Sequence, residues 1–246
     1  AGDTIQVGDI FAGVANVQNI DPQGSTTSWA QDPVDDTDGI DQFTAYFAAE
    51  VALIVPDFEG TNELIVYKAT DTDPFGILDT ADNEVFQFYI DDSDTVYSIS
   101  TANLQASVDS ATDTDEYWSF SLDDPDITAS GSAIWDSTNS YWYSLAESDF
   151  SDVNNNANAL AYGGLYLNEN PLGPPLETVL NDPGEGLGDK TVDLYFQSEI
   201  ELGNGIWTFD SNDPAGVYPT PEPTTLVLFG TGLLGLVGLV RRKYKS

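Results

Sequence analysis

The chain has 246 residues, which suits one large all-β domain or two small ones. It carries 42 acidic and 6 basic residues, a formal net charge of −36, and it contains no His, Cys or Met. These absences exclude a Ser-His-Asp triad, a thiol nucleophile, a His-ligated metal, a zinc finger and a disulfide. A surface this negative repels phosphates, so we expect no nucleic-acid partner.

The charge is divided unevenly along the chain. Residues 1–220 hold 41 acidic residues and 2 basic ones, Lys68 and Lys190, for a net charge of −39. Residues 221–246 hold Glu222 and 4 basic residues, for a net charge of +3. We therefore predict an acidic body over residues 1–218 and a separate C-terminal segment over residues 219–246.

Alternation of apolar and polar residues predicts β-strands throughout the body. The longest period-2 patterns are Phe43–Val55 and Val192–Leu202. Shorter runs of the same kind are Ile5–Ile20, Leu64–Ala69, Val85–Ile90, Val96–Ile99, Tyr117–Leu122, Ala133–Trp135, Trp142–Leu145, Leu160–Leu167 and Ile206–Phe209. Turn-forming Asp, Asn, Gly, Pro and Ser separate these runs. About ten strands with turns between them predict an all-β, antiparallel β-sandwich or jelly-roll-like body. Residues 151–159 allow one short helix.

Aspartates gather in the predicted turns, and the densest group is a candidate calcium site. Asp outnumbers Glu by 30 to 12, and Asp35, Asp36, Asp38 and Asp41 lie within ten residues around Gly39. Alternate carboxylates before a Gly turn can point at one hard cation, which takes 6–8 oxygen ligands. The full EF-hand pattern is missing. The alternative is a solvated acidic surface, and the two interpretations are compatible.

Aromatic residues form a second candidate site. Trp135, Tyr141, Trp142 and Tyr143 lie close together in the sequence. Exposed rings on a β-sandwich can stack on sugars, so these four residues are candidate glycan contacts. The alternative is that the rings fill the core, since buried Trp and Tyr side chains each cover a large apolar area. On a strand, Tyr141 and Tyr143 would point to one face and Trp142 to the other.

Two carboxylates about 5–9.5 Å apart are the requirement for glycoside hydrolysis. With 42 acidic residues, some pair at this spacing is expected by chance, and no pair stands out. We therefore predict a protein that is not an enzyme. A carboxylate-based glycosidase stays as the less favoured alternative.

The C-terminal segment has the composition of a membrane span. Thr224–Val240 is a run of 17 residues without a charge. As a helix it extends about 25 Å, which is within the range of a transmembrane helix. The basic residues that follow predict a cytoplasmic C-terminus and an external body. The alternative is a buried core helix.

A proline-rich triplet precedes this run, and arginines follow it. Pro221, Glu222 and Pro223 lie just before the Gly-bearing apolar residues, and Arg241 and Arg242 come directly after them. This order of parts resembles the PEP-CTERM sorting signal of Gram-negative bacteria. The resemblance covers the last 26 residues and leaves the body unassigned. It implies export, recognition by an exosortase-type membrane protease, and transfer to the cell surface or extracellular matrix, where such proteins accompany exopolysaccharide. A plain membrane anchor is the alternative.

Together these features predict an exported, non-enzymatic structural or adhesive protein of the cell surface or biofilm matrix. Its expected partners are the exosortase-type protease, the bacterial membrane, exopolysaccharide and further copies of itself, in oligomers or filaments. An exported protein needs a secretion signal, so we expect that the numbering from Ala1 follows signal-peptide removal. The main alternative is a calcium-dependent carbohydrate-binding β-sandwich module.

Overall fold

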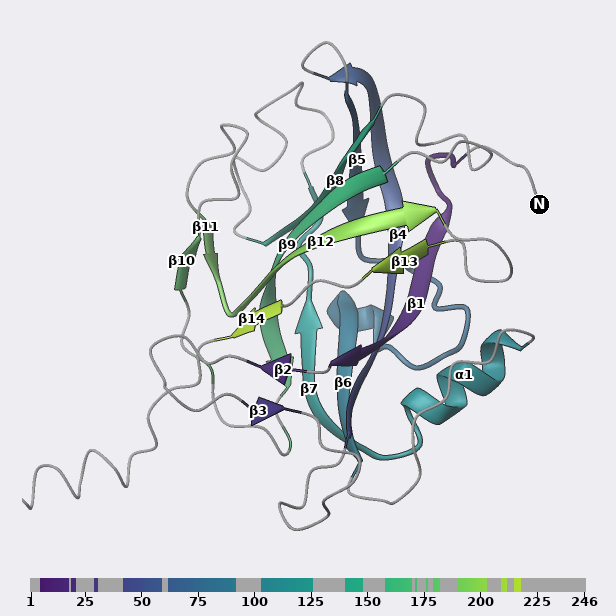
Figure 1. Cartoon of the computed structure of the whole chain (residues 1–246), viewed down its shortest axis with the longest axis vertical. Coiled ribbons are helices and arrows are strands. Elements are labelled where there is room, and N and C mark those ends of the chain that lie inside the picture. Colours follow the sequence, from purple (N-terminus) through teal and green to yellow (C-terminus); the bar gives the residue numbers. More distant parts are fainter. Residues whose placement is uncertain are drawn as a thin grey trace, which may run out of the picture.

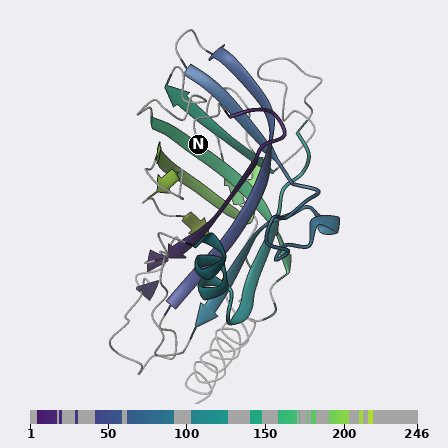
Figure 2. The ribbon, with the colours of Figure 1, turned by 90° about the vertical axis from the view of Figure 1, so that its right-hand side faces the viewer.

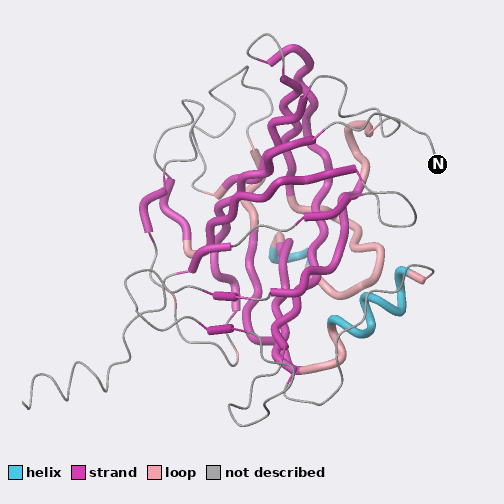
Figure 3. Tube along the Cα trace, in the orientation of Figure 1, coloured by secondary structure: helices cyan, strands magenta, loops and turns pink. Residues whose placement is uncertain are grey.

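The computed structural model describes residues 5–17, 19–20, 29–30, 42–58, 62–91, 103–125, 140–147, 158–169, 171, 176, 179–181, 190–202, 209–211 and 215–217. Strands dominate this part of the chain, and its helices are one short α-helix and one 3-10 turn (Figure 3). The predicted antiparallel all-β body is confirmed at this level, whereas the jelly-roll arrangement and the division at residue 218 stay predictions.

Figure 1 shows the elements in chain order. Their bounds are β1 (Ile10–Val17), β2 (Asn19–Ile20), β3 (Trp29–Ala30), β4 (Gln42–Phe58), β5 (Asn62–Lys68), the 3-10 helix η1 (Thr80–Asp82), β6 (Glu84–Asp91), α1 (Leu104–Ala111), β7 (Asp115–Ser121), β8 (Tyr141–Glu147), β9 (Asn158–Glu169), β10 (Val179–Asn181), β11 (Lys190–Val192), β12 (Leu194–Leu202), β13 (Phe209–Ser211) and β14 (Ala215–Val217).

Ten strands form one antiparallel sheet whose pairings close into a ring. The ring runs β4–β6–β7–β9–β8–β5 and returns to β4. Outside it, β1 pairs with β4, β12 pairs with β9, and β13 and β14 both pair with β12. The short pairs β2–β3 and β10–β11 are separate.

The two longest strands turn the sheet back on itself. β4 pairs with β6 through its first half and with β5 through its second half, over 17 residues. β9 pairs with β8 through its first part and with β7 near its end. Each long strand therefore belongs to both sides of the curved sheet (Figure 2).

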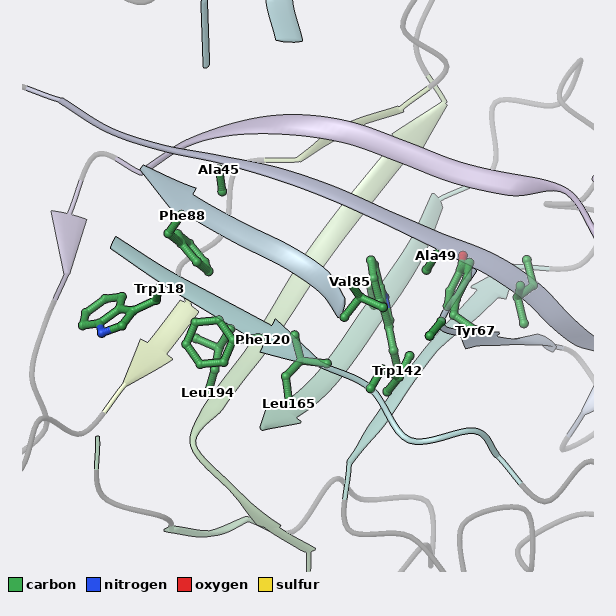
Figure 4. Close-up of a cluster of buried hydrophobic side chains, with 14 of the residues drawn as sticks. Ala45, Ala49, Tyr67, Val85, Phe88, Trp118, Phe120, Trp142, Leu165 and Leu194 are labelled. Carbon is green, nitrogen blue, oxygen red and sulfur yellow. The ribbon is translucent and has the colours of Figure 1, made fainter. Parts of the chain in front are cut away.

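The enclosed face of the ring holds a continuous apolar core. All six ring strands and β12 contribute buried side chains to it (Figure 4). Aromatic rings lie in mutual contact there: Phe43 stacks on Phe88 with centroids 5.4 Å apart, and Phe86 lies 5.2 Å from Trp142. A chain without disulfides thus gains its stability from a large shared core.

The outer face of β4 is covered by α1 and by the segment that precedes η1. Tyr46 and Ala48 are fully buried there against Leu78, Tyr89 and Val108. The helix begins because the Asn103 side chain accepts a hydrogen bond from the Ala106 N–H, and it ends at Thr112. Figure 2 shows α1 beside the purple β1, with which it is in contact.

This helix is an addition to the sequence-based prediction, which within the body allowed a helix only at residues 151–159. Residues 151–157 lie outside the described part, and residues 158–159 already belong to β9. The strand predicted over Val192–Leu202 is present, with one break at Asp193 between β11 and β12.

Candidate functional site

Several predicted site residues lie outside the described part of the chain. They are the proposed calcium ligands Asp35, Asp36, Asp38 and Asp41, the sorting-motif residues Pro221, Glu222, Pro223, Arg241 and Arg242, and Trp135. Among the described residues, no group of three or more acidic side chains has the arrangement of a metal site. The calcium site therefore stays a prediction.

The other three proposed glycan contacts are core residues. Tyr141, Trp142 and Tyr143 are 2%, 2% and 0% exposed. Trp142 points into the enclosed core, and the two tyrosines point to the opposite face, as the alternation predicts. No face of these rings is open to a sugar in this conformation, so the structure supports the alternative that they fill the core.

Two hydrogen-bonded carboxylates lie on the outer face near β6. Asp73 is the first of them, and its carboxylate organises the segment before η1. One oxygen accepts hydrogen bonds from the Tyr46 hydroxyl and the Phe75 N–H, and the other accepts from the Ile77 and Leu78 N–H groups. Four donors on one carboxylate fix this segment against β4. Burial and the neighbouring Asp73 raise the pKa of Tyr46 far above its ordinary value.

Glu84 is the second polar anchor of this face. Its side chain is 2% exposed, and one carboxylate oxygen accepts hydrogen bonds from the Asp79 N–H at 2.7 Å and the Gln87 amide at 2.8 Å. Gln87 in turn accepts a hydrogen bond from the Tyr89 hydroxyl. A register shift between Glu84 and Phe86 lets Glu84 share the outer face with Gln87.

Glu116 on β7 and Glu169 on β9 complete what we call the carboxylate cluster, Glu84–Glu116–Glu169. Glu116 lies opposite Tyr89, and the Glu169 N–H donates to the Ser119 hydroxyl at 3.2 Å. One carboxylate oxygen of Glu116 is shielded from solvent and has no hydrogen-bond partner. Burial, followed by repulsion from Glu84 and Glu169, raises the pKa of Glu116 above its ordinary value.

A carboxyl group with a raised pKa can hold a proton and act as a general acid where a substrate reaches it. Here the shielded oxygen of Glu116 faces protein, and Glu84 is committed to the Asp79 and Gln87 donors. The contact of Glu84 with the Asp79 N–H thus holds the segment before β6 in place. The sequence gives no sign of this arrangement, because its members come from three strands.

The remaining evidence comes from comparison with known proteins. The model of the PEP-CTERM protein-sorting motif matches residues 219–243. The chain carries a PEP-CTERM sorting motif. The resemblance drawn from Pro221–Pro223 and the arginines is thereby confirmed. The motif implies an exported bacterial protein that is anchored in the membrane at its C-terminus and processed by an exosortase.

The comparisons assign nothing to the body of the chain. A search of curated proteins and a search of solved structures each found no match. No helix in the described part of the chain is long and apolar enough to span a membrane. The predicted span, Thr224–Val240, lies outside that part.

Proposed function

We propose that this protein is a non-enzymatic structural or adhesive component of the cell surface or extracellular matrix of a Gram-negative bacterium. The observation that carries the proposal is the PEP-CTERM motif at residues 219–243 behind an acidic all-β body. The protein acts after export, when the exosortase has transferred or released it.

The sorting step is tested by replacing Pro221, Glu222 and Pro223 with Ala in a bacterium that has an exosortase. We expect the unchanged protein in the surface or matrix fraction with its tail shortened, and the variant at full length in the membrane. A matched control replaces Asn212, Asp213 and Pro214 with Ala, which changes three residues just upstream of the motif. Equal distribution of all three proteins would contradict the proposal.

The matrix role is tested by deleting the gene and measuring the mass and cohesion of the biofilm. We expect a weaker matrix that the unchanged protein restores and the triple-Ala tail variant does not. An unchanged biofilm would count against the structural role. Turnover of an exopolysaccharide by purified protein, abolished by a single Asp→Asn or Glu→Gln substitution, would instead establish the glycosidase alternative.

The carbohydrate-binding alternative now depends on Trp135 and other residues outside the described part, since Tyr141, Trp142 and Tyr143 are buried. Its test is a glycan array in the presence of calcium. Binding that Trp135→Ala removes would favour a carbohydrate-binding module. The absence of glycan binding would leave the structural role as the better explanation of a surface location.

Calcium binding by Asp35, Asp36, Asp38 and Asp41 is a separate part of the proposal. Calcium takes 6–8 oxygen ligands, which carboxylates closely spaced in the sequence can supply. We expect a chelator at low salt to lower the melting temperature by several degrees, and Asp36→Asn with Asp38→Asn to remove this effect. The matched control, Asp123→Asn with Asp124→Asn, should keep it. An unchanged melting temperature with chelator would remove calcium from the proposal.

A further inference from the structure

Strand β1 is an edge of the sheet. Among the described strands it pairs only with β4. The Val51 N–H donates to the Asp9 carbonyl at 2.9 Å, which fixes the phase of the pairing. Backbone groups then alternate along an antiparallel strand, so the N–H and C=O groups of residues 11, 13, 15 and 17 point toward β4. Those of Ile10, Ala12, Val14 and Asn16 point away from it.

The outward groups of β1 are unpaired within the described part of the chain. No backbone hydrogen bond to Ile10, Ala12 or Val14 exists there beyond the pairing with β4. Such an edge is a template for another strand, and proteins usually protect it with charges or Pro. Ile10–Val17 has neither. Its one bulge, at Gly8 with φ of 94°, lies before the strand begins.

The start of β1 also exposes apolar side chains. Val7 is 61% exposed and Ile10 is 39% exposed, although both are large and apolar. Asp9 is the one charged residue in the segment 5–17, in a chain with a net charge of −36. This combination of an unpaired edge, exposed apolar side chains and low charge is typical of an association surface.

Charge decides which partner fits this edge. Two copies of so acidic a chain repel each other over most of their surfaces. By contrast, the register of β12 and β13 pairs two acidic residues, Glu201 and Asp210. Two β1 strands meet without a charged residue between Ile10 and Val17. The same segment on each copy satisfies the self-complementarity that a two-fold interface requires.

We propose that β1 pairs antiparallel with β1 of a second copy, so that the sheets of the two copies join in a symmetric dimer. With the two-fold axis at Gly13, Ala12 lies opposite Val14 of the second copy, and Ile10 lies opposite Asn16. Every outward N–H and C=O from Ile10 to Asn16 is then paired. This inference rests on the proposed function in one respect, because a structural matrix protein is expected to associate with further copies of itself.

The first test is sedimentation of the full chain in a mild detergent over a range of concentrations. We expect a dimer that tightens with salt, because the Debye length falls from about 10 Å at about 0.1 M salt to about 3 Å at about 1 M. Ala12→Pro removes an outward N–H and keeps the pairing with β4, and Pro is tolerated on edge strands. This variant should be monomeric at every salt concentration.

A second pair of variants keeps the test decisive if Ala12→Pro does not fold. Ile10→Glu and Leu160→Glu each add one negative charge at a side chain that is 39% exposed, on β1 and on the outer face of β9 respectively. We expect at least a tenfold weaker dimer for Ile10→Glu and an unchanged dimer for Leu160→Glu. A monomer at all salt concentrations, or a dimer that Ile10→Glu leaves unchanged, would overturn the inference.

Hydrogen exchange identifies the strand that covers the edge. The amides of Ile10, Ala12 and Val14 should become protected as the protein concentration rises. Protection that does not depend on concentration would show that another part of the same chain covers β1, and that result also overturns the inference. These measurements use purified protein, so they remain valid if the protein proves absent from the cell surface. Conversely, a monomer that still reaches the matrix would refute the dimer and leave the proposed function intact.

Discussion

The two faces of the curved sheet are stabilised in different ways. The enclosed face is filled by apolar side chains from all six ring strands and β12, many of them aromatic. The outer face next to α1 depends on individual hydrogen bonds, above all those of Asp73 and Glu84. The loss in the free energy of unfolding should therefore scale with the volume removed for substitutions on the enclosed face. For substitutions on the outer face it should scale with the number of hydrogen-bond donors left unpaired.

The largest effect is expected for Trp142→Ala on the enclosed face. Trp142 is 2% exposed and lies within 6.0 Å, between ring centroids, of Phe11, Phe47, Tyr67, Phe86 and Phe196. Removing it should lower the free energy of unfolding by about 3–5 kcal/mol, as measured by denaturant titration. Leu160→Ala, at a 39% exposed position, should change it by about 0.5 kcal/mol or less. Similar losses for the two variants would refute the assignment of Trp142 to the core.

On the outer face, Asp73→Ala should have the next largest effect. It leaves the Phe75, Ile77 and Leu78 N–H groups and the Tyr46 hydroxyl without their acceptor. We expect a loss of about 2–4 kcal/mol in the free energy of unfolding. Asp71→Ala is the matched control, since Asp71 is exposed in the same segment. Tyr46→Phe removes a single hydrogen bond and should cost about 1 kcal/mol. An equal loss for Asp71→Ala would show that charge, and not hydrogen bonding, sets the effect.

Two adjacent glycines on β9 allow the faces to be compared directly. A Cβ atom on Gly163 would lie 2.1 Å from the Phe196 ring on the enclosed face, and one on Gly164 would lie 2.5 Å from the Tyr141 ring on the outer face. Phe196 is only partly buried and can move, whereas Tyr141 is 2% exposed. Gly164→Ala should therefore cost more than Gly163→Ala, within a range of about 1–3 kcal/mol. Thermal denaturation gives the order, and the reverse order would show that Phe196 is the more tightly held ring.

The strands could be predicted because alternation survives in the sequence. Phe43–Val55 and Leu160–Leu167 fall within β4 and β9. The alternation in β4 did not show that its outer face is also buried. Tyr46 and Ala48 on that face pack against α1, and this helix of 8 residues is too short to give a clear amphipathic pattern in the sequence. The choice between core and glycan contact for Tyr141 and Tyr143 could not be made from the sequence for a similar reason, because proximity along the chain does not show what covers a strand.

The polar contacts of the outer face could not be predicted at all. Asp73 accepts a hydrogen bond from Tyr46, which lies 27 residues earlier in the chain. The carboxylate cluster depends on the pairing of β6, β7 and β9 and on register shifts within it. Neither pairing nor bulges can be deduced from a single sequence with turns this similar. The sorting motif at residues 219–243 could be predicted, because it is formed by consecutive residues.

The smallest effect concerns the dependence of stability on pH, and it arises at Glu116 on the outer face. The pKa of Glu116 is raised in the folded protein, first by burial and then by Glu84 and Glu169. The folded state therefore binds the proton of the Glu116 carboxyl group more tightly than the unfolded state does. Protonation of Glu116 thus increases the stability of the fold as the pH falls from above the raised pKa toward the ordinary pKa of Glu. Glu116→Gln keeps the shape without the charge, and it should be more stable than the unchanged protein at neutral pH. The difference should vanish as the mildly acidic range is reached. Denaturant titration from neutral to mildly acidic pH measures both, and Glu169→Gln serves as a comparison that relieves repulsion but leaves Glu116 titratable. A Glu116→Gln variant that is less stable than the unchanged protein at neutral pH would contradict this prediction. It would show that the shielded carboxylate oxygen of Glu116 accepts a stabilising hydrogen bond.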